Sequence, residues 1–159
     1  MLFRSADRKV EITDADLEAI VAQEVGTKGI DRYGFVRLDV HGGTEVQPSA
    51  EVGLTDAETG DEVSARGEGN GMIDAAIAAI AAATGVAGSV LDFKVASVTK
   101  GGDALGQVTI QLEVDGAKAS GRGVATDVVE ASARAYLNAV NRLVRIRARG
   151  TARERTVGP

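Results

Sequence analysis

The chain carries the same pattern twice, and this repetition is what most limits the folds open to it. Two glycine-rich stretches, 67–71 and 121–123, each come directly before an alanine-rich segment with helical spacing. Each also follows three short runs in which apolar and polar residues alternate, as in half-buried strands. The sequence therefore predicts a strand-strand-strand-helix unit used twice. We expect an α+β fold with antiparallel sheets and the helices on one side.

Local signals set the boundaries of the two units. Gly85 is a typical helix stop, and Asp115-Gly116 is a strong two-residue hairpin signal. Asp127 and Glu130 match a capping box at the start of the second helix. We therefore divide the chain into a linker segment with a short helix over about 13–25 (1–33), a domain (34–150) with units 34–86 and 87–150, and a tail (151–159).

Composition excludes several classes of function. The 159 residues contain no Cys and one His, His41. Disulfides, thiol catalysis and cysteine metal sites are therefore excluded, and a Ser-His-Asp triad or a His-based metal site is disfavoured. The net charge of −5 argues against a nucleic-acid or acidic-membrane partner. No apolar stretch reaches transmembrane length and no signal peptide is recognisable. We expect a cytoplasmic protein with no cofactor and no catalytic residues.

The two glycine turns are the first candidate sites. The N-terminus of a helix offers unpaired amides and a positive dipole end, where carboxylates and phosphates bind. The alternative is a plain strand-to-helix turn. Neither a dinucleotide fingerprint nor a P-loop is completed here. A second candidate is the segment 100–106, in which Asp103 could face an ammonium group, with a bulged hairpin as the alternative.

Four blocks in the correct order resemble the C-terminal regulatory domain of 2-isopropylmalate synthase. They are GEGNGMIDAA at 67–76, SVLDF at 89–93, GGDALGQ at 101–107 and GRGVATDVVEASARAYLNAVNR at 121–142. The resemblance covers about 35–145, and residues 8–17 are similar to the linker that precedes this domain. It implies two strand-rich units that form a homodimer and bind the end product of the pathway, leucine. Citramalate synthase uses a similar domain to sense isoleucine, and a purely structural dimerisation module is a further alternative.

The resemblance also implies which residues contact the effector. By position these are Gly69, Asn70, Gly71, Ile73, Val90, Phe93, Ser97, Ala104 and Val128. Asp103 and Thr126 are added to this set on chemical grounds. The chain departs from the family at Met72, where Pro is usual, and at Phe93, which is often Tyr. The catalytic barrel of the acyl-CoA-dependent synthase is not expected within this sequence, so the chain by itself is not expected to be an enzyme.

Overall fold

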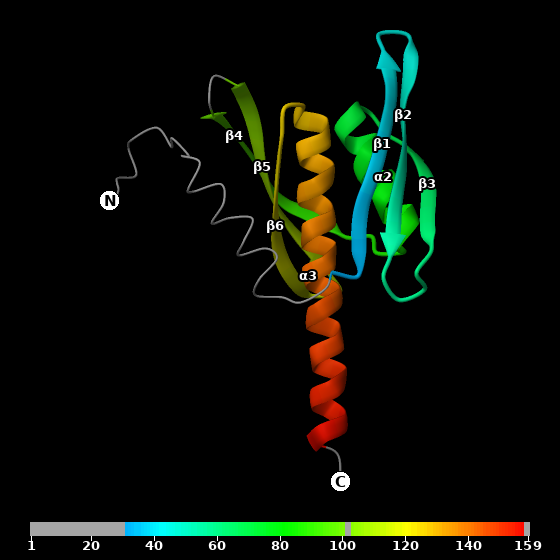
Figure 1. Ribbon diagram of the computed structural model, residues 1–159, viewed down its shortest axis with the longest axis vertical. Helices are drawn as coiled ribbons and strands as arrows, with labels where there is room; N and C mark the ends of the chain where they lie inside the picture. The colour runs from blue at the N-terminus through cyan, green and yellow to red at the C-terminus, as the bar shows by residue number, and fades with distance from the viewer. Residues whose placement is uncertain (1–30, 101–102, 158–159) are drawn as a thin grey trace, which may run out of the picture.

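The computed structural model describes residues 31–100 and 103–157, and within them it contains the predicted unit twice. The elements are β1 (Tyr33–Gly43), β2 (Val46–Asp56), β3 (Glu62–Glu68), α2 (Met72–Thr84), β4 (Ser89–Lys100), β5 (Asp103–Val114), β6 (Ala117–Ala125) and α3 (Val128–Val157). The strands form two antiparallel sheets with the orders β1-β2-β3 and β4-β5-β6 (Figure 1). This confirms the expected α+β fold. The short helix predicted over 13–25 lies outside the described residues.

The turn signals recognised in the sequence are also confirmed. Gly85 adopts φ 73°, and its amide donates to the carbonyl oxygen of Ala81 at 2.9 Å, which ends α2. Asp115 and Gly116 both have positive φ, 51° and 84°. That pair of values is what a tight turn between β5 and β6 requires.

The two units share one core because each helix packs on its own sheet and also on the other helix. Helix α2 covers β2 and β3, whereas α3 covers β5 and β6. Most of the buried side chains from both units form one cluster that includes Val52, Leu54 and Ile80 of the first unit and Ile110, Leu112, Tyr136 and Val140 of the second. Val98 is buried in a separate small cluster with Leu105 and Val124. Many of the remaining core residues are alanines, which lets the helices approach the sheets closely.

Glycines make the closest of these approaches. Gly67 lies in β3, where a Cβ would stand 2.7 Å from the carbonyl carbon of Ala78 in α2. Gly121 lies in β6, where a Cβ would collide with the carbonyl oxygen of Ala135 and the amide of Ala139 in α3. Gly123 packs in the same way. The prediction that residues 121–123 form a turn open to a ligand is therefore wrong: these glycines let strand and helix backbones touch.

The two helices differ in length, with 13 residues in α2 and 30 in α3. The lower half of α3 extends beyond both sheets (Figure 1). Its upper half also packs on β1 of the other unit. The helix continues to Val157 and so passes position 150, where the sequence suggested the start of a tail. No helix among the described residues is long and apolar enough to cross a membrane.

Candidate functional site

The turn between β3 and α2 is hydrogen-bonded to β2 on one side and exposed to solvent on the other. The Gly69 amide donates to the Pro48 carbonyl at 3.2 Å, and the Gln47 side chain donates to the Gly69 carbonyl at 2.9 Å. Gly71 then begins the helix in an extended conformation, with φ −148° and ψ 175°. Asn70 is exposed and Met72 is 42% exposed. The first turn of α2 therefore lies at the surface on a fixed support.

The starts of the two helices differ in a way that matters for ligand binding. At α3, Asp127 Oδ1 accepts the Val129 amide at 2.7 Å, so a side chain of the protein caps this helix. At α2, no side chain among the described residues caps the helix from position 71. The first amides of α2 are left to solvent or to an anion. Glu130 pairs with Arg134 at 2.9 Å and does not close a capping box, so that half of the prediction is wrong.

The predicted positions Val90 and Phe93 lie on a face of β4 that the described residues leave partly exposed. Val90 and Phe93 are paired with Leu112 and Ile110 of β5, so they share the helix side of the sheet. Their partners on β5 are fully buried under α3, whereas Val90 and Phe93 are 40% and 37% exposed. Val95 on the same face is 53% exposed. Helix α3 therefore covers β5 and β6 and leaves the apolar face of β4 bare.

Four other predicted residues gather at one end of the second sheet. Ser97 pairs with Gly106, which pairs in turn with Ala125, just before Thr126 and Val128. A Cβ on Gly106 would stand 4.0 Å from the Val128 Cα. Ala104 lies beside this row, opposite Thr99. Asp103 opens β5 opposite Lys100, so the connection between β4 and β5 is an antiparallel hairpin.

Within one chain, the α2 turn, the predicted positions on β4 and the residues at the end of the second sheet do not form a single site. The α2 turn packs against the β1–β2 hairpin, where Met72 lies close to Gly42. Both helices begin at the end of the molecule where the β1–β2 and β4–β5 hairpins turn (Figure 1). The structure thus brings Ser97, Thr126 and Val128 together near the start of α3. It does not bring Val90 or Phe93 against the α2 turn, because β4 packs on β5 while α2 packs on β2, β3 and α3.

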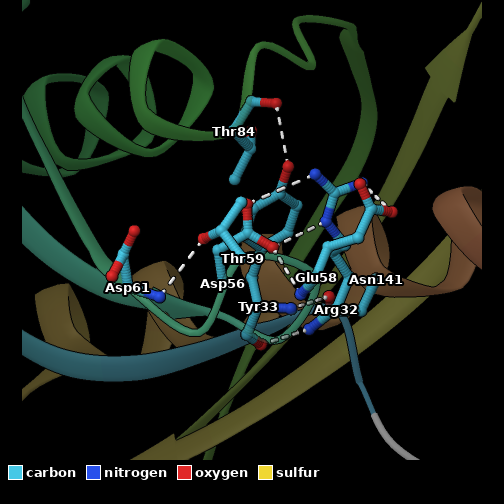
Figure 2. A network of polar contacts seen from close by, with 8 residues as sticks. All are labelled: Arg32, Tyr33, Asp56, Glu58, Thr59, Asp61, Thr84 and Asn141. Atoms are coloured by element: carbon cyan, nitrogen blue, oxygen red, sulfur yellow. Dashed lines mark hydrogen bonds and ion pairs between the residues drawn. The ribbon is translucent and has the colours of Figure 1, made fainter.

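Sequence reasoning missed a polar network at the opposite end of the domain (Figure 2). Arg32 Nε donates to Asp56 Oδ1 at 2.8 Å and Arg32 also pairs with Glu58 at 3.2 Å. The Arg32 guanidinium lowers the pKa of the Asp56 carboxyl, and burial raises the pKa of the Tyr33 hydroxyl. The Tyr33 hydroxyl donates to the Thr84 carbonyl at 3.3 Å, at the end of α2. The one sequence signal for this network was Asn141, a polar residue on a largely apolar face of the last helix.

Taken together, the structure defines a duplicated βββα domain in which α2 starts without a side-chain cap among the described residues and one face of β4 carries exposed apolar side chains. A family model described as the LeuA allosteric (dimerisation) domain matches residues 11–144. The chain belongs to this family.

The following relatives found by sequence are larger proteins. The chain is 51% identical over 151 residues to a 2-isopropylmalate synthase of Acidimicrobium ferrooxidans, covering 94% of this chain and 28% of that protein. It is 45% identical to the 2-isopropylmalate synthase of Parasynechococcus marenigrum and 44% identical to that of Pelotomaculum thermopropionicum, covering 87% of this chain in each case. The chain spans about a quarter of the length of these curated relatives.

Proposed function

We propose that this chain is the effector-binding and dimerisation domain of a 2-isopropylmalate synthase, and that its effector is leucine. The observation that carries the proposal is the contrast between the two helix starts. Asp127 accepts the Val129 amide at the start of α3, while the amides of α2 have no side-chain cap among the described residues. A ligand carboxylate is the group that would complete the α2 end.

The ligand's side chain has an apolar surface available to it. Ile73 follows the open amides, and Val90, Phe93 and Val128 are exposed large apolar residues at the other predicted positions. Burying a leucine-sized side chain is worth roughly 1.5–3 kcal/mol. Shape alone separates leucine from isoleucine by about 1–3 kcal/mol at most. Isoleucine, the effector of citramalate synthase, is therefore the second candidate for the same site.

A second copy of the chain is proposed to complete the site. The bare face of β4 carries Val90, Phe93 and Val95, and it does not meet the α2 turn of its own chain. Contiguous apolar surface of this kind marks an interaction site. Pairing of two chains through β4 would bury this face and provide new neighbours for the effector positions on it. Coupling to a catalytic barrel elsewhere in the synthase would need about 1–3 kcal/mol.

A thermal-shift series tests the effector. Leucine, isoleucine, valine and a 2-oxo dicarboxylic acid are each added to the chain up to millimolar concentration. A ligand that binds only the folded state raises the melting temperature. We expect the largest rise with leucine. A larger rise with isoleucine supports the citramalate-synthase alternative, and no rise with any of the four supports a purely structural dimerisation module.

The substitution Gly71→Asp tests the placement of the site. A Cβ at Gly71 meets nothing within 4 Å, so the side chain fits and its carboxylate caps α2 in place of the ligand. We expect the part of the leucine response that comes from the α2 turn to disappear, while the ligand-free domain becomes slightly more stable. Gly71→Ala is the matched control, because it adds the Cβ without a capping oxygen and is expected to keep the response. Gly69 is unsuitable, since a Cβ there would stand 2.6 Å from the Asp74 Cβ.

A further inference from the structure

A second pocket lies between the outer edge of β1 and the first turns of α3. Its volume is about 360 Å³, near the lower end of the range of about 300–1,000 Å³ typical of small-molecule sites. Phe35, Leu38 and Val40 line it from β1, and Asp127, Glu130 and Arg134 line it from α3. None of these residues belongs to the effector set at the α2 turn.

Arg134 is held in place inside this pocket. Its guanidinium carbon lies 4.2 Å from the centroid of the Phe35 ring, and its Nε donates to Glu130 Oε2 at 2.9 Å. Its two terminal nitrogens have no hydrogen-bond partner among the groups whose placement the structure describes. A guanidinium fixed in this way presents two parallel donors, which is the geometry that binds a carboxylate bidentately.

Negative charge lies on the same few turns of α3. Asp127 uses Oδ1 to cap the helix, and its Oδ2 has no partner within the described part of the chain. Glu130 pairs with Arg134 through one oxygen only. A ligand with a carboxylate alone would face these two acids, and a ligand with an ammonium alone would leave the Arg134 fork unused. A zwitterionic ligand can pair its carboxylate with Arg134 and its ammonium with the two acids. Leu38 and Val40 provide an apolar wall for its side chain.

We propose that this pocket binds a free aliphatic α-amino acid at a second site, separate from the α2 turn. The ligand carboxylate pairs with the terminal nitrogens of Arg134. The ammonium lies between Asp127 and Glu130, and the aliphatic side chain packs on Leu38 and Val40. The pocket joins β1 of the first unit to α3 of the second, so an occupant ties the two units together. This inference goes beyond the effector site proposed above and does not depend on it.

Calorimetric titration of the chain tests this site, with Gly71→Asp as the background that closes the α2 turn. The probes are leucine, isoleucine, valine and methionine, together with 3-methylbutylamine and 4-methylpentanoate, which each lack one charge. We expect at least one of the four amino acids to bind the background variant with one equivalent. Neither singly charged probe should bind as tightly. Loss of a charge-assisted contact weakens affinity by about tenfold or more.

Two further substitutions in that background locate the ligand. Arg134→Gln removes the fork, and Asp127→Asn removes a charge while keeping an equally good helix cap. Each is expected to weaken amino-acid binding at least about tenfold. Arg122→Gln, on the exposed side of β6, is the control and should change nothing.

The outcomes separate the two sites. Absence of binding to Gly71→Asp below about 10 mM, or binding that Arg134→Gln leaves unchanged, overturns the second site. If the chain binds one equivalent that Gly71→Asp removes, the α2 effector site stands and the second site falls. If the chain binds one equivalent that persists in Gly71→Asp and is lost with Arg134→Gln, the second site stands and the α2 effector site falls.

Discussion

Asn141 forms two hydrogen bonds with the main chain of Tyr33, a residue 108 positions earlier in the sequence. The Tyr33 amide donates to Asn141 Oδ1 and the Asn141 side-chain amide donates to the Tyr33 carbonyl, both at 2.9 Å. One side chain of α3 thus replaces a strand neighbour at the first residue of β1. The point where the chain enters the domain is thereby fixed to the last helix.

Asn141→Ala is expected to destabilise the domain strongly. Asn141 is 2% exposed, and its truncation leaves a buried amide and a buried carbonyl of Tyr33 without partners. Each unsatisfied group costs about 1–3 kcal/mol, so the free energy of unfolding should fall by about 2–6 kcal/mol. Asn138→Ala is the control on the same helix, since Asn138 makes a single exposed bond to the Arg122 carbonyl and should cost about 1 kcal/mol. Urea denaturation measures both, and equal losses would contradict the prediction.

Asp56 should make the stability of the domain depend on pH. Its folded-state pKa is lowered, chiefly by the hydrogen bond from Arg32, so the ionised carboxylate favours the folded state. This contribution is complete above the unfolded pKa of about 3.9 and is lost as pH falls through the folded value. The destabilisation caused by Asp56→Asn should therefore be largest near pH 7 and shrink below about pH 4. Melting curves across this range check it, with the exposed Asp61→Asn as control; a gap independent of pH would refute it.

Gly121→Ala tests the contact between the β6 and α3 backbones. The added methyl group would collide with the backbone of Ala135 and Ala139, so strand and helix must separate. Overpacking of this kind typically costs about 1–3 kcal/mol of unfolding free energy. Gly43→Ala, where a Cβ meets nothing within 4 Å, should stay within about 0.5 kcal/mol of the parent chain. A tolerated Gly121→Ala would show that the two elements have room to move apart.

Val95→Glu tests the proposed pairing of chains through β4. Val95 is 53% exposed on the bare apolar face, and burying an unpaired carboxylate in an interface is strongly unfavourable. We expect size-exclusion chromatography with light scattering to show a shift from dimer towards monomer. Val46→Glu, at the equally exposed start of β2, should leave the dimer intact. If only Val46→Glu dissociates the chains, the interface lies elsewhere.

Most of the fold follows from local signals in the sequence. Alternating runs, the stop at Gly85 and the Asp115-Gly116 hairpin fixed the elements and their order, because each signal acts over a few residues. Gly121 was misassigned because glycine serves both turns and close strand–helix contacts, and only the packing of α3 on β6 distinguishes them. The arginines between 142 and 155 favoured a solvated end of the last helix, and α3 does continue to Val157, so only the boundary drawn at 150 fell inside a helix.

The candidate site was less accessible to sequence reasoning. The open start of α2 was expected from its glycines and the Asp127 cap of α3 from the capping-box pattern, but the glycines at 121 and 123 were wrongly interpreted as a second open turn. The pocket between β1 and α3 went unnoticed because Phe35 and Arg134 are far apart in sequence and meet only through tertiary packing. The contact between Tyr33 and Asn141 was missed for the same reason, because the two residues are far apart in sequence and meet only through tertiary packing.

The bare face of β4 has a consequence for how the protein is made. While the chain emerges from the ribosome, this strand is present before any partner subunit can cover it. Its other face carries Asp92 and Lys94, whose charged groups lie 3.5 Å apart and are exposed to water, and, towards the end of the strand, Val98, which is packed against Leu105 and Val124. The apolar residue on that second face is already packed within the subunit, so a newly synthesised chain is expected to associate through the face of Val90, Phe93 and Val95 and not back to back.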